Sequence, residues 1–363
     1  MSRRAPTRTL PLRAGQNNNP RKLPAMRMLA LLCLLLASSF TLAADAPAAG
    51  QPPVKRKFCV FDIAGAHGDI FRTMQDYRLE MLKHGVDFTL VPYTSEKIAA
   101  EDFKAGQCDA ADLTSFRIRN FVKYAGTVDA VGALPTREHV KLALQALAHP
   151  SMAPKLRSGP YEIAGIVPIG AAYVFTRDRK IDTITKAAGK RVAVLDYDPE
   201  MAGMVSRLGA SPVPSDLTNF AGKFNNGSVD IIVAPAAAFK PLELYKGLEP
   251  NGAIIDFPFT QISAMVIVRS EKFPPEMLQF AREQVFANID KVYDIVDKMA
   301  ADVPKKYWVP IPAADKAKYE ILMRDTRIEL RERGYYDADA LTLLRKVRCK
   351  VDSSRAECTD KLE

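Results

Sequence analysis

Short apolar runs alternate along the chain with segments whose apolar residues recur every three or four positions. The clearest example lies between residues 189 and 241. Residues 192–195 and 229–234 have the composition of buried strands, and residues 200–208 show a helical spacing that stops at Gly209. Strands and helices that alternate in this way form a parallel sheet with right-handed crossovers, so this stretch predicts an α/β fold.

The same alternation predicts a first lobe ahead of this stretch. Strands are expected at residues 58–63 and 86–91, and helices at residues 70–83 and 96–104. Residues 128–134 are predicted to form a further strand of this lobe.

Two long apolar segments are predicted to cross between the lobes. Residues 162–176 are longer than one strand needs, and residues 253–267 read as the strand pair that carries the chain back. Two crossings without a long flexible linker form a hinge between the lobes. Helical patterns over residues 275–301, 315–334 and 338–346 then predict helices that brace both lobes.

The amino terminus has the pattern of a secretory signal peptide. Arg27 precedes a short apolar run at residues 28–36, and small residues follow up to a cleavage site after Ala43. The apolar run is too short for a membrane span. We therefore expect export to the periplasm, with Met1, Met26 and Met28 as alternative start sites.

Removal of the signal peptide changes the charge of the chain. The formal net charge is +9, but residues 1–43 contain seven basic and no acidic residues, which leaves 44 Lys and Arg beside 42 Asp and Glu. A nearly neutral exported protein has no electrostatic reason to bind nucleic acid.

Cleavage also leaves four cysteines, and an even number in an exported protein favours disulfides. We favour Cys349 with Cys358, which closes a small loop, and Cys59 with Cys108, which are expected on neighbouring strands. Other connectivities and free thiols are the alternatives. No Cys or His spacing typical of a metal site is present in the sequence, so neither a metal nor a cofactor is expected.

These observations divide the chain into parts. The predicted boundaries are a signal peptide at 1–43, a flexible leader at 44–54, lobe 1 at 55–165 completed by about 262–300, lobe 2 at 166–261, and a C-terminal helical segment at 301–363 that contains a disulfide.

Several stretches resemble the DctP-type periplasmic solute-binding proteins that feed TRAP transporters. The resemblance covers about residues 58–293 and is clearest at residues 179–192, 208–213 and 224–230. Residues 244–250 resemble a divergent branch of solute-binding or RND-efflux-associated proteins. The resemblance implies a two-lobed, type II periplasmic-binding-protein-like fold with hinge strands and C-terminal helices.

One position departs from the DctP pattern. Members of that family carry an arginine that clamps the ligand carboxylate on the strand after Gly189, and Ala193 stands at that position here. A bidentate arginine–carboxylate pair is a strong, orienting contact. Arg191, two residues earlier on the same strand face, is the alternative clamp.

The candidate ligand contacts follow or end predicted strands on one side of a sheet, where such folds bind small molecules. They are His67, Gly68, Asp69, Tyr173, Arg191, Phe239 and Gln261, together with the two stretches Ser115, Phe116, Arg117 and Asp196, Tyr197, Asp198. Free backbone N–H groups at Gly68 and Asp69, at a helix start, favour an anion. A capping or packing role is the alternative at each position.

No catalytic motif of the G-x-S-x-G or H-E-x-x-H kind occurs in the sequence, and its four histidines are scattered, so we expect no enzymatic activity. The predicted function is capture of a small polar solute, with organic anions among the candidates, and delivery to inner-membrane transporter subunits by a monomer. A periplasmic accessory or adaptor protein of an efflux or envelope system is the alternative, and a periplasmic enzyme is a further one.

Overall fold

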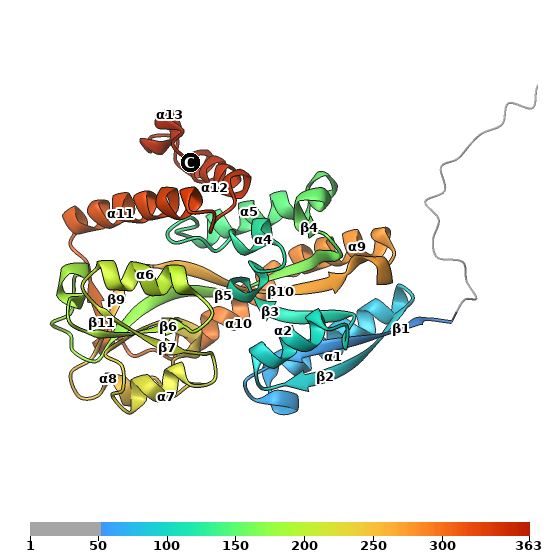
Figure 1. Cartoon of the computed structure of the whole chain (residues 1–363), viewed down its shortest axis with the longest axis horizontal. Coiled ribbons are helices and arrows are strands. Elements are labelled where there is room, and N and C mark those ends of the chain that lie inside the picture. Colours follow the sequence, from blue (N-terminus) through green and yellow to red (C-terminus); the bar gives the residue numbers. More distant parts are fainter. Residues whose placement is uncertain (1–51) are drawn as a thin grey trace, which may run out of the picture. The chain divides into compact units, whose positions relative to one another are not determined.

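One long strand, β5 (Tyr161–Thr176), belongs to both halves of the sheet in the computed structural model (Figure 1). The strand order is β2-β1-β3-β10-β5-β8-β6-β7. Antiparallel β10 (Thr260–Arg269) pairs with residues 161–172 of β5, and antiparallel β8 (Ile231–Pro235) pairs with residues 172–176. The predicted crossing segment is therefore a single strand whose hydrogen-bond ladder runs from one lobe into the other.

The structure describes residues 52–363. The predicted signal peptide and most of the predicted leader lie outside the described residues. Within the described part, no helix combines the length and the apolar character needed to cross a membrane.

The first lobe is built on parallel strands that β10 joins in the antiparallel sense. Its strands are β1 (Val54–Phe61), β2 (Val86–Tyr93), β3 (Ala110–Thr114) and the short β4 (Arg157–Ser158). Its helices are α1 (Asp69–Lys83), α2 (Glu96–Lys104), α3 (Ser115–Ile118), α4 (Lys123–Gly126) and α5 (Arg137–Ala148). Apolar side chains of α2 and α5 share one core, and those of α1 share a second core with α9 (Pro275–Ala287).

The second lobe contains the parallel strands β6 (Arg191–Leu195), β7 (Ser211–Ser215) and β8, and the paired strands β9 (Ala253–Asp256) and β11 (Trp308–Pro310). Its helices are α6 (Pro199–Arg207), α7 (Phe220–Asn225) and α8 (Tyr245–Leu248). The sequence analysis did not predict β7, because Pro212 and Pro214 interrupt its pattern. Both prolines are tolerated because β7 ends the strand order and needs no further ladder partner.

Helices dominate the last part of the chain. After α9 come α10 (Ile289–Ala300), α11 (Ala313–Glu332), α12 (Ala338–Val351) and α13 (Glu357–Asp360). Short 3-10 helices lie at Gly65–His67, Pro150–Leu156, Ile184–Ala187, Ala236–Ala238, Ser270–Lys272 and Lys305–Tyr307. Leu341 and Leu344 of α12 enter the core that α5 shares, so α12 is part of the first lobe's packing (Figure 1).

The predicted strand at residues 128–134 is wrong, because these residues form turns. Gly132 has φ +59°, a left-handed conformation that favours glycine, and its N–H donates to Phe259 O at 2.9 Å. The Asp129 carboxylate accepts from the Ser263 N–H at 2.6 Å. Contacts from this loop to the start of β10 and the residue before it therefore replace a strand ladder.

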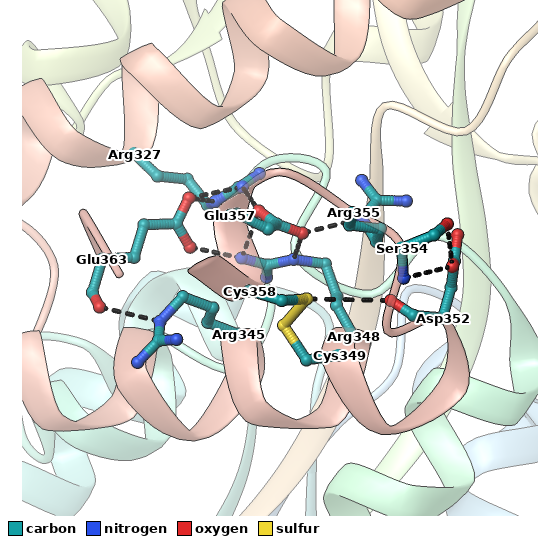
Figure 2. Close-up of a disulfide and its surroundings, with 10 residues drawn as sticks. All are labelled: Arg327, Arg345, Arg348, Cys349, Asp352, Ser354, Arg355, Glu357, Cys358 and Glu363. Atoms are coloured by element: carbon teal, nitrogen blue, oxygen red, sulfur yellow. Dashed lines mark hydrogen bonds and ion pairs between the residues drawn. A yellow bond between two sulfur atoms is a disulfide. The ribbon is translucent and has the colours of Figure 1, made fainter. Parts of the chain in front are cut away.

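The structure confirms both favoured disulfides. Cys59 lies on β1 and Cys108 just before the neighbouring strand β3, with their Cα atoms 5.9 Å apart. Cys349 on α12 bridges to Cys358 on α13, with their Cα atoms 5.6 Å apart (Figure 2). The second bridge holds α13 beside the end of α12.

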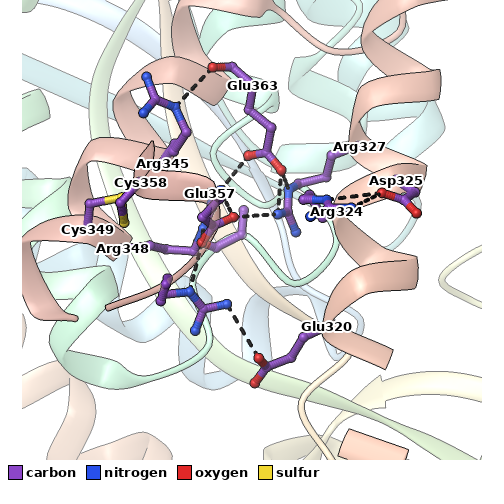
Figure 3. A network of polar contacts seen from close by, with 12 residues as sticks. Glu320, Arg324, Asp325, Arg327, Arg345, Arg348, Cys349, Glu357, Cys358 and Glu363 are labelled. Atoms are coloured by element: carbon purple, nitrogen blue, oxygen red, sulfur yellow. Dashed lines mark hydrogen bonds and ion pairs between the residues drawn. A yellow bond between two sulfur atoms is a disulfide. The ribbon is translucent and has the colours of Figure 1, made fainter. Parts of the chain in front are cut away.

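A buried cluster of arginines and glutamates lies next to this second bridge (Figures 2 and 3). The fully buried Arg348 donates to both Glu357 oxygens, at 2.7 and 3.0 Å, and also binds the Glu363 carboxylate. Arg327 donates to the same Glu363 carboxylate at 2.8 Å. Charges buried this deeply are tolerated only when each is paired and hydrogen-bonded.

Backbone carbonyls of the 128–134 loop complete this cluster. Arg327 donates to Val131 O at 2.8 Å, and Arg348 donates to Ala133 O at 3.0 Å. Burial opposes ionisation of Glu357, but hydrogen bonds and charge from Arg348 and then Arg355 lower the pKa of Glu357 to about 2. The cluster thus fastens the C-terminal helices to a loop of the first lobe.

Replacing Cys59 and Cys108 together by Ala should lower the free energy of unfolding more than replacing Cys349 and Cys358. In the chain-entropy description, a bridge between residues 49 apart in sequence stabilises by roughly 4 kcal/mol, and one between residues 9 apart by roughly 2.5 kcal/mol. Chemical denaturation of the two double variants measures the difference. Equal losses would show that local packing outweighs loop length.

Glu357→Gln should destabilise the protein at pH 7 by roughly 3 kcal/mol, because Arg355 loses its pair with this carboxylate and the buried Arg348 keeps only Glu363. The stabilisation from this carboxylate is fully present above pH 4.5 and is lost as the pH falls toward 2, because folding lowers its pKa. Denaturant unfolding at pH 7, 4 and 3 should therefore show that the difference in free energy of unfolding between the unmodified chain and Glu357→Gln becomes smaller as the pH falls. Glu332→Gln, an exposed carboxylate of α11, is the control. A difference in free energy of unfolding that does not change with pH would contradict the prediction.

Candidate functional site

A cavity of about 290 Å³ is lined by both lobes and by the C-terminal helices. Strand β6, through residues 192–195, and strand β8 form its second-lobe wall. Phe116 and Val131 contribute from the first lobe, Met323 from α11, and Tyr336 from the connection between α11 and α12. The cavity therefore has three walls from three parts of the chain.

The cavity is predominantly apolar. Its wall includes methionine, aromatic and aliphatic side chains, such as Met201, Met204, Phe257 and Tyr319. Among the described residues that line it, Arg119 is the only basic one, whereas Asp129, Asp182 and Asp198 are acidic. An organic molecule in this space would contact mainly hydrocarbon and thioether groups.

Ala193 lies in the cavity wall at the position where the DctP pattern has its clamping arginine. The alternative clamp, Arg191, is held elsewhere. Its guanidinium donates to both oxygens of Asp230, at 3.0 and 2.7 Å, and the hydrogen bonds and charge of Arg191 lower the pKa of Asp230. Arg191 is exposed and does not line the cavity.

One polar corner of the cavity joins its three walls. Arg119 of the first lobe donates to the Tyr335 hydroxyl, which in turn donates to Asp198 of the second lobe at 2.5 Å. Arg119 also donates to Gly126 O at 3.0 Å, and its guanidinium lies 3.9 Å from Asp198. Burial raises the pKa of the Tyr335 hydroxyl, so it stays protonated and can donate.

Asp198 is fixed in this corner by the start of α6. Its other carboxylate oxygen accepts the Met201 N–H at 3.0 Å, as expected for the N-cap of a helix that has proline at its first position. The backbone of Arg119 packs directly against Gly126. A Cβ at Gly126 would lie only 2.5 Å from the Cα of Arg119, so the contact requires glycine. The local sequence thus orients both charged groups.

Asp129 is the second acid that faces Arg119. Burial raises the pKa of its carboxyl to about 6, although hydrogen bonds from the N–H and the hydroxyl of Ser263 and the charge of Arg119 act to lower it. Asp129 is therefore mostly ionised at neutral pH. The positive charge of Arg119 is therefore balanced by Asp198, with Asp129 close enough to feel its charge, although the Nε of Arg119 has no hydrogen-bond partner among the described residues.

A second contact between the lobes lies outside the cavity wall. The Arg117 guanidinium stacks on the Tyr197 ring, 3.4 Å from its centre, and the Tyr197 hydroxyl lies 3.4 Å from Glu96. Glu96 also accepts hydrogen bonds from the backbone and the hydroxyl of Thr114, both at 2.7 Å. Arg117, a predicted ligand contact, thus packs at the lobe interface.

The predicted anion position at the start of α1 is occupied by the chain itself. The Asp62 carboxylate accepts the N–H groups of Ile70 and Phe71, at 2.9 and 3.1 Å. Any side chain at Gly68 would collide with this carboxylate, because a Cβ would lie 1.9 Å from it. Gly68 is needed here for the close approach of Asp62, and Asp69 forms an exposed ion pair with Arg72.

The strand ends beside this position carry further acids. Asp112 on β3 is buried, and burial together with repulsion from Glu96 and Asp62 raises its pKa to about 8. Burial also raises the pKa of Glu96. This part of the first lobe therefore has acidic rather than basic character. No group of His, Cys, Asp and Glu residues in the described part is arranged to hold a metal ion.

The other predicted contacts are dispersed. Tyr173 packs against Trp308 with ring centres 4.9 Å apart, and Phe239 is buried in the second-lobe core. Gln261 is buried and donates to Leu134 O at 3.0 Å. Asp196 is exposed, Ser115 is buried, and the side chain of His67 is exposed.

Of the predicted contacts, only Phe116 and Asp198 line the cavity, and ligand binding by any of them stays a prediction. The strand-end signal therefore found the right segments. Tyr335 and Tyr336 gave no signal beyond an aromatic pair after a helix end at Gly334.

Comparison with known proteins identifies relatives of the chain. A family described as "Solute-binding protein AdeT 1/2" matches residues 83–363. The chain is 44% identical over 299 residues to the probable solute-binding protein AdeT1 of Acinetobacter baumannii, which covers 82% of this chain and 98% of AdeT1. It is 28% identical over 233 residues to AdeT2 of the same organism, across 64% of this chain and 98% of AdeT2.

Solved structures share the fold at low sequence identity. A TRAP periplasmic solute-binding protein from Desulfovibrio salexigens with bound orotic acid has a TM-score of 0.66 at 15% identity, and covers 85% of this chain and 99% of its own. Another from Xanthobacter autotrophicus with bound β-D-galacturonate has a TM-score of 0.63 at 14% identity, with 80% and 99% covered. These matches confirm the predicted two-lobed α/β fold.

The long family match and the 44% identity to AdeT1 also confirm the resemblance to solute-binding proteins. The chain belongs to the AdeT 1/2 family of solute-binding proteins.

Proposed function

We propose that this solute-binding protein captures an organic solute with a largely apolar surface in the cavity between β6, the 128–134 loop and the C-terminal helices. The observation that supports the proposal is the cavity wall, which is apolar and has a single, already balanced basic residue, Arg119. The solute would be captured in the periplasm, after export by the predicted signal peptide, and presented to inner-membrane transporter subunits without chemical change.

Charge in the wall favours a neutral solute over a carboxylate. The structural relatives bind organic anions such as orotate and galacturonate. Here Ala193 stands at the clamp position, Arg191 is paired with Asp230, and acids surround Arg119. A carboxylate in the cavity would lose its hydration without gaining an unpaired cation.

The free energy gained by burying apolar surface of the solute is large enough to give useful affinity. At about 25 cal/mol per Å², a solute that loses about 200 Å² of apolar surface gains roughly 5 kcal/mol before the cost of immobilisation. A hydrogen bond to a charged group contributes about 1.5–3 kcal/mol. The apolar contacts would therefore dominate binding, and the polar corner would select among solutes of similar shape.

Matched pairs of compounds test this proposal. Thermal shift and isothermal titration with aromatic and branched carboxylates, each beside its neutral methyl ester, should show tighter binding of the esters, because only the carboxylates must be desolvated without a partner. A solute near a hundred times its Kd should stabilise the protein by about 2.7 kcal/mol, a shift of a few degrees in Tm. Succinate and galacturonate are the control anions. Micromolar binding of these anions, with no binding of the esters, would contradict the proposal.

Ala193→Arg should reverse this preference by restoring a cation at the clamp position. We expect carboxylate affinity to rise about tenfold, the equivalent of about 1.4 kcal/mol, while ester affinity falls because the cavity is smaller. Ala193→Leu is the matched control, since it adds bulk without charge and should weaken both members of a pair. If both variants behave alike in titrations, Ala193 does not face the bound solute.

A further inference from the structure

We infer that Tyr335 is a positioning residue that latches the two lobes together, so that closure around the solute depends on the C-terminal segment, residues 313–363. The inference about solute retention rests on the proposed function. The latch itself can be tested without any solute. The segment is joined to the first lobe by buried, paired charges, and it contacts the second lobe through apolar packing of α11, exposed ion pairs and the Tyr335 hydroxyl.

The firm attachment is to the first lobe, through the buried cluster of Figure 3. Arg327 and Arg348 donate to the carbonyl groups of Val131 and Ala133, which flank Gly132. Met323 of α11 packs so closely on Gly132 that a Cβ there would lie 2.4 Å from its sulfur. The loop that supplies Val131 to the cavity is thus the same loop that anchors the segment.

Outside the cavity corner, the segment contacts the second lobe through apolar packing and through exposed ion pairs. Met323 and Tyr319 of α11 pack in one cluster with Ile255 and Phe257, and the rings of Phe257 and Tyr319 lie 5.8 Å apart. Glu329 and Arg333 form ion pairs with Arg207 and Glu200 of α6, at 2.9 and 2.7 Å. These side chains are 27–47% exposed. Ion pairs in such exposed positions contribute only about 0–1 kcal/mol each. They can therefore break and re-form as the lobes move.

The Tyr335 hydroxyl is different, because it joins three parts of the chain in a buried position. It accepts from Arg119 of the first lobe and donates to Asp198 of the second lobe at 2.5 Å. The side chains of Arg119 and Asp198 are only 7% and 4% exposed. Separation of the lobes would break this bond and expose both charges to water at the cavity wall.

The rest of the Tyr335 side chain is held within the first lobe. Its ring lies 4.1 Å from the Arg119 guanidinium carbon and 4.9 Å from the ring of Tyr336. Lys123 donates to the neighbouring carbonyl of Gly334 at 2.7 Å. Replacing tyrosine by phenylalanine therefore removes the hydroxyl bridge and leaves the ring packing in place.

Tyr335→Phe should shift the solute-free protein toward an open state. Small-angle X-ray scattering should show a larger radius of gyration for this variant than for the unmodified chain. Tyr336→Phe is the matched control, since the Tyr336 hydroxyl accepts only from Val131 N–H, at 3.4 Å, within the first lobe. Asp198→Asn removes the acceptor charge from the other side, keeps an N-cap residue, and should open the protein in the same way.

A solute found in the screen provides the second readout. Tyr335→Phe should increase its dissociation rate about tenfold, with an association rate close to that of the unmodified chain and a denaturant midpoint close to that of Tyr336→Phe. Saturating solute should restore the closed radius of gyration, which a purely destabilised fold would not show. Identical scattering of Tyr335→Phe and the unmodified chain would overturn the latch. If the screen finds no solute and Tyr335→Phe still has the larger radius of gyration, the latch is supported and only the proposed function is refuted.

Discussion

The two lobes depend on the hydrogen-bond ladder of one strand, β5. Ten of its first twelve residues pair with β10 in the first lobe, and its last five pair with β8 in the second, with Ala172 common to both. Because the peptide bonds of one strand serve both ladders, the lobes cannot separate as independent domains and can only turn about this strand. Because β5 fixes where the two lobes meet, it also fixes the position of the cavity and of the contacts at its polar corner.

The arginines near the ligand space are engaged in contacts that hold the structure together. The buried Arg327 and Arg348 pair with Glu357 and Glu363 in the C-terminal cluster, and the exposed Arg191 pairs with Asp230. Arg119 of the first lobe donates to the Tyr335 hydroxyl and lies beside Asp198 of the second lobe. A cation that already has its partners stabilises the closed fold but has little attraction left for a ligand. This distribution explains how a chain with the fold of anion-binding proteins can present an apolar cavity.

The C-terminal helices have two roles that follow from one attachment. Through the 128–134 loop they stabilise the first lobe, and through Met323, Tyr335 and Tyr336 they complete the cavity wall. The sequence analysis predicted only that these helices brace the lobes. Their part in the site depends on where α11 lies over the second lobe, which no pattern within α11 itself records.

Local patterns in the sequence determined the α/β class, the crossing strand β5 and the strand β6. They favoured both cysteine pairs without excluding other connectivities, and the resemblance to the DctP pattern placed Ala193 at the clamp position. These features depend on periodicity and on neighbours along the chain, which a sequence displays directly. Tertiary structure alone decided that the carboxylate of Asp62 occupies the start of α1, that Gly132 bends a predicted strand into a loop, and that Asp198 rather than Asp196 faces the cavity. Each of these outcomes depends on a partner distant in sequence or on the direction of one side chain at a strand end. Neither of these produces a periodic pattern of apolar and polar residues in the sequence.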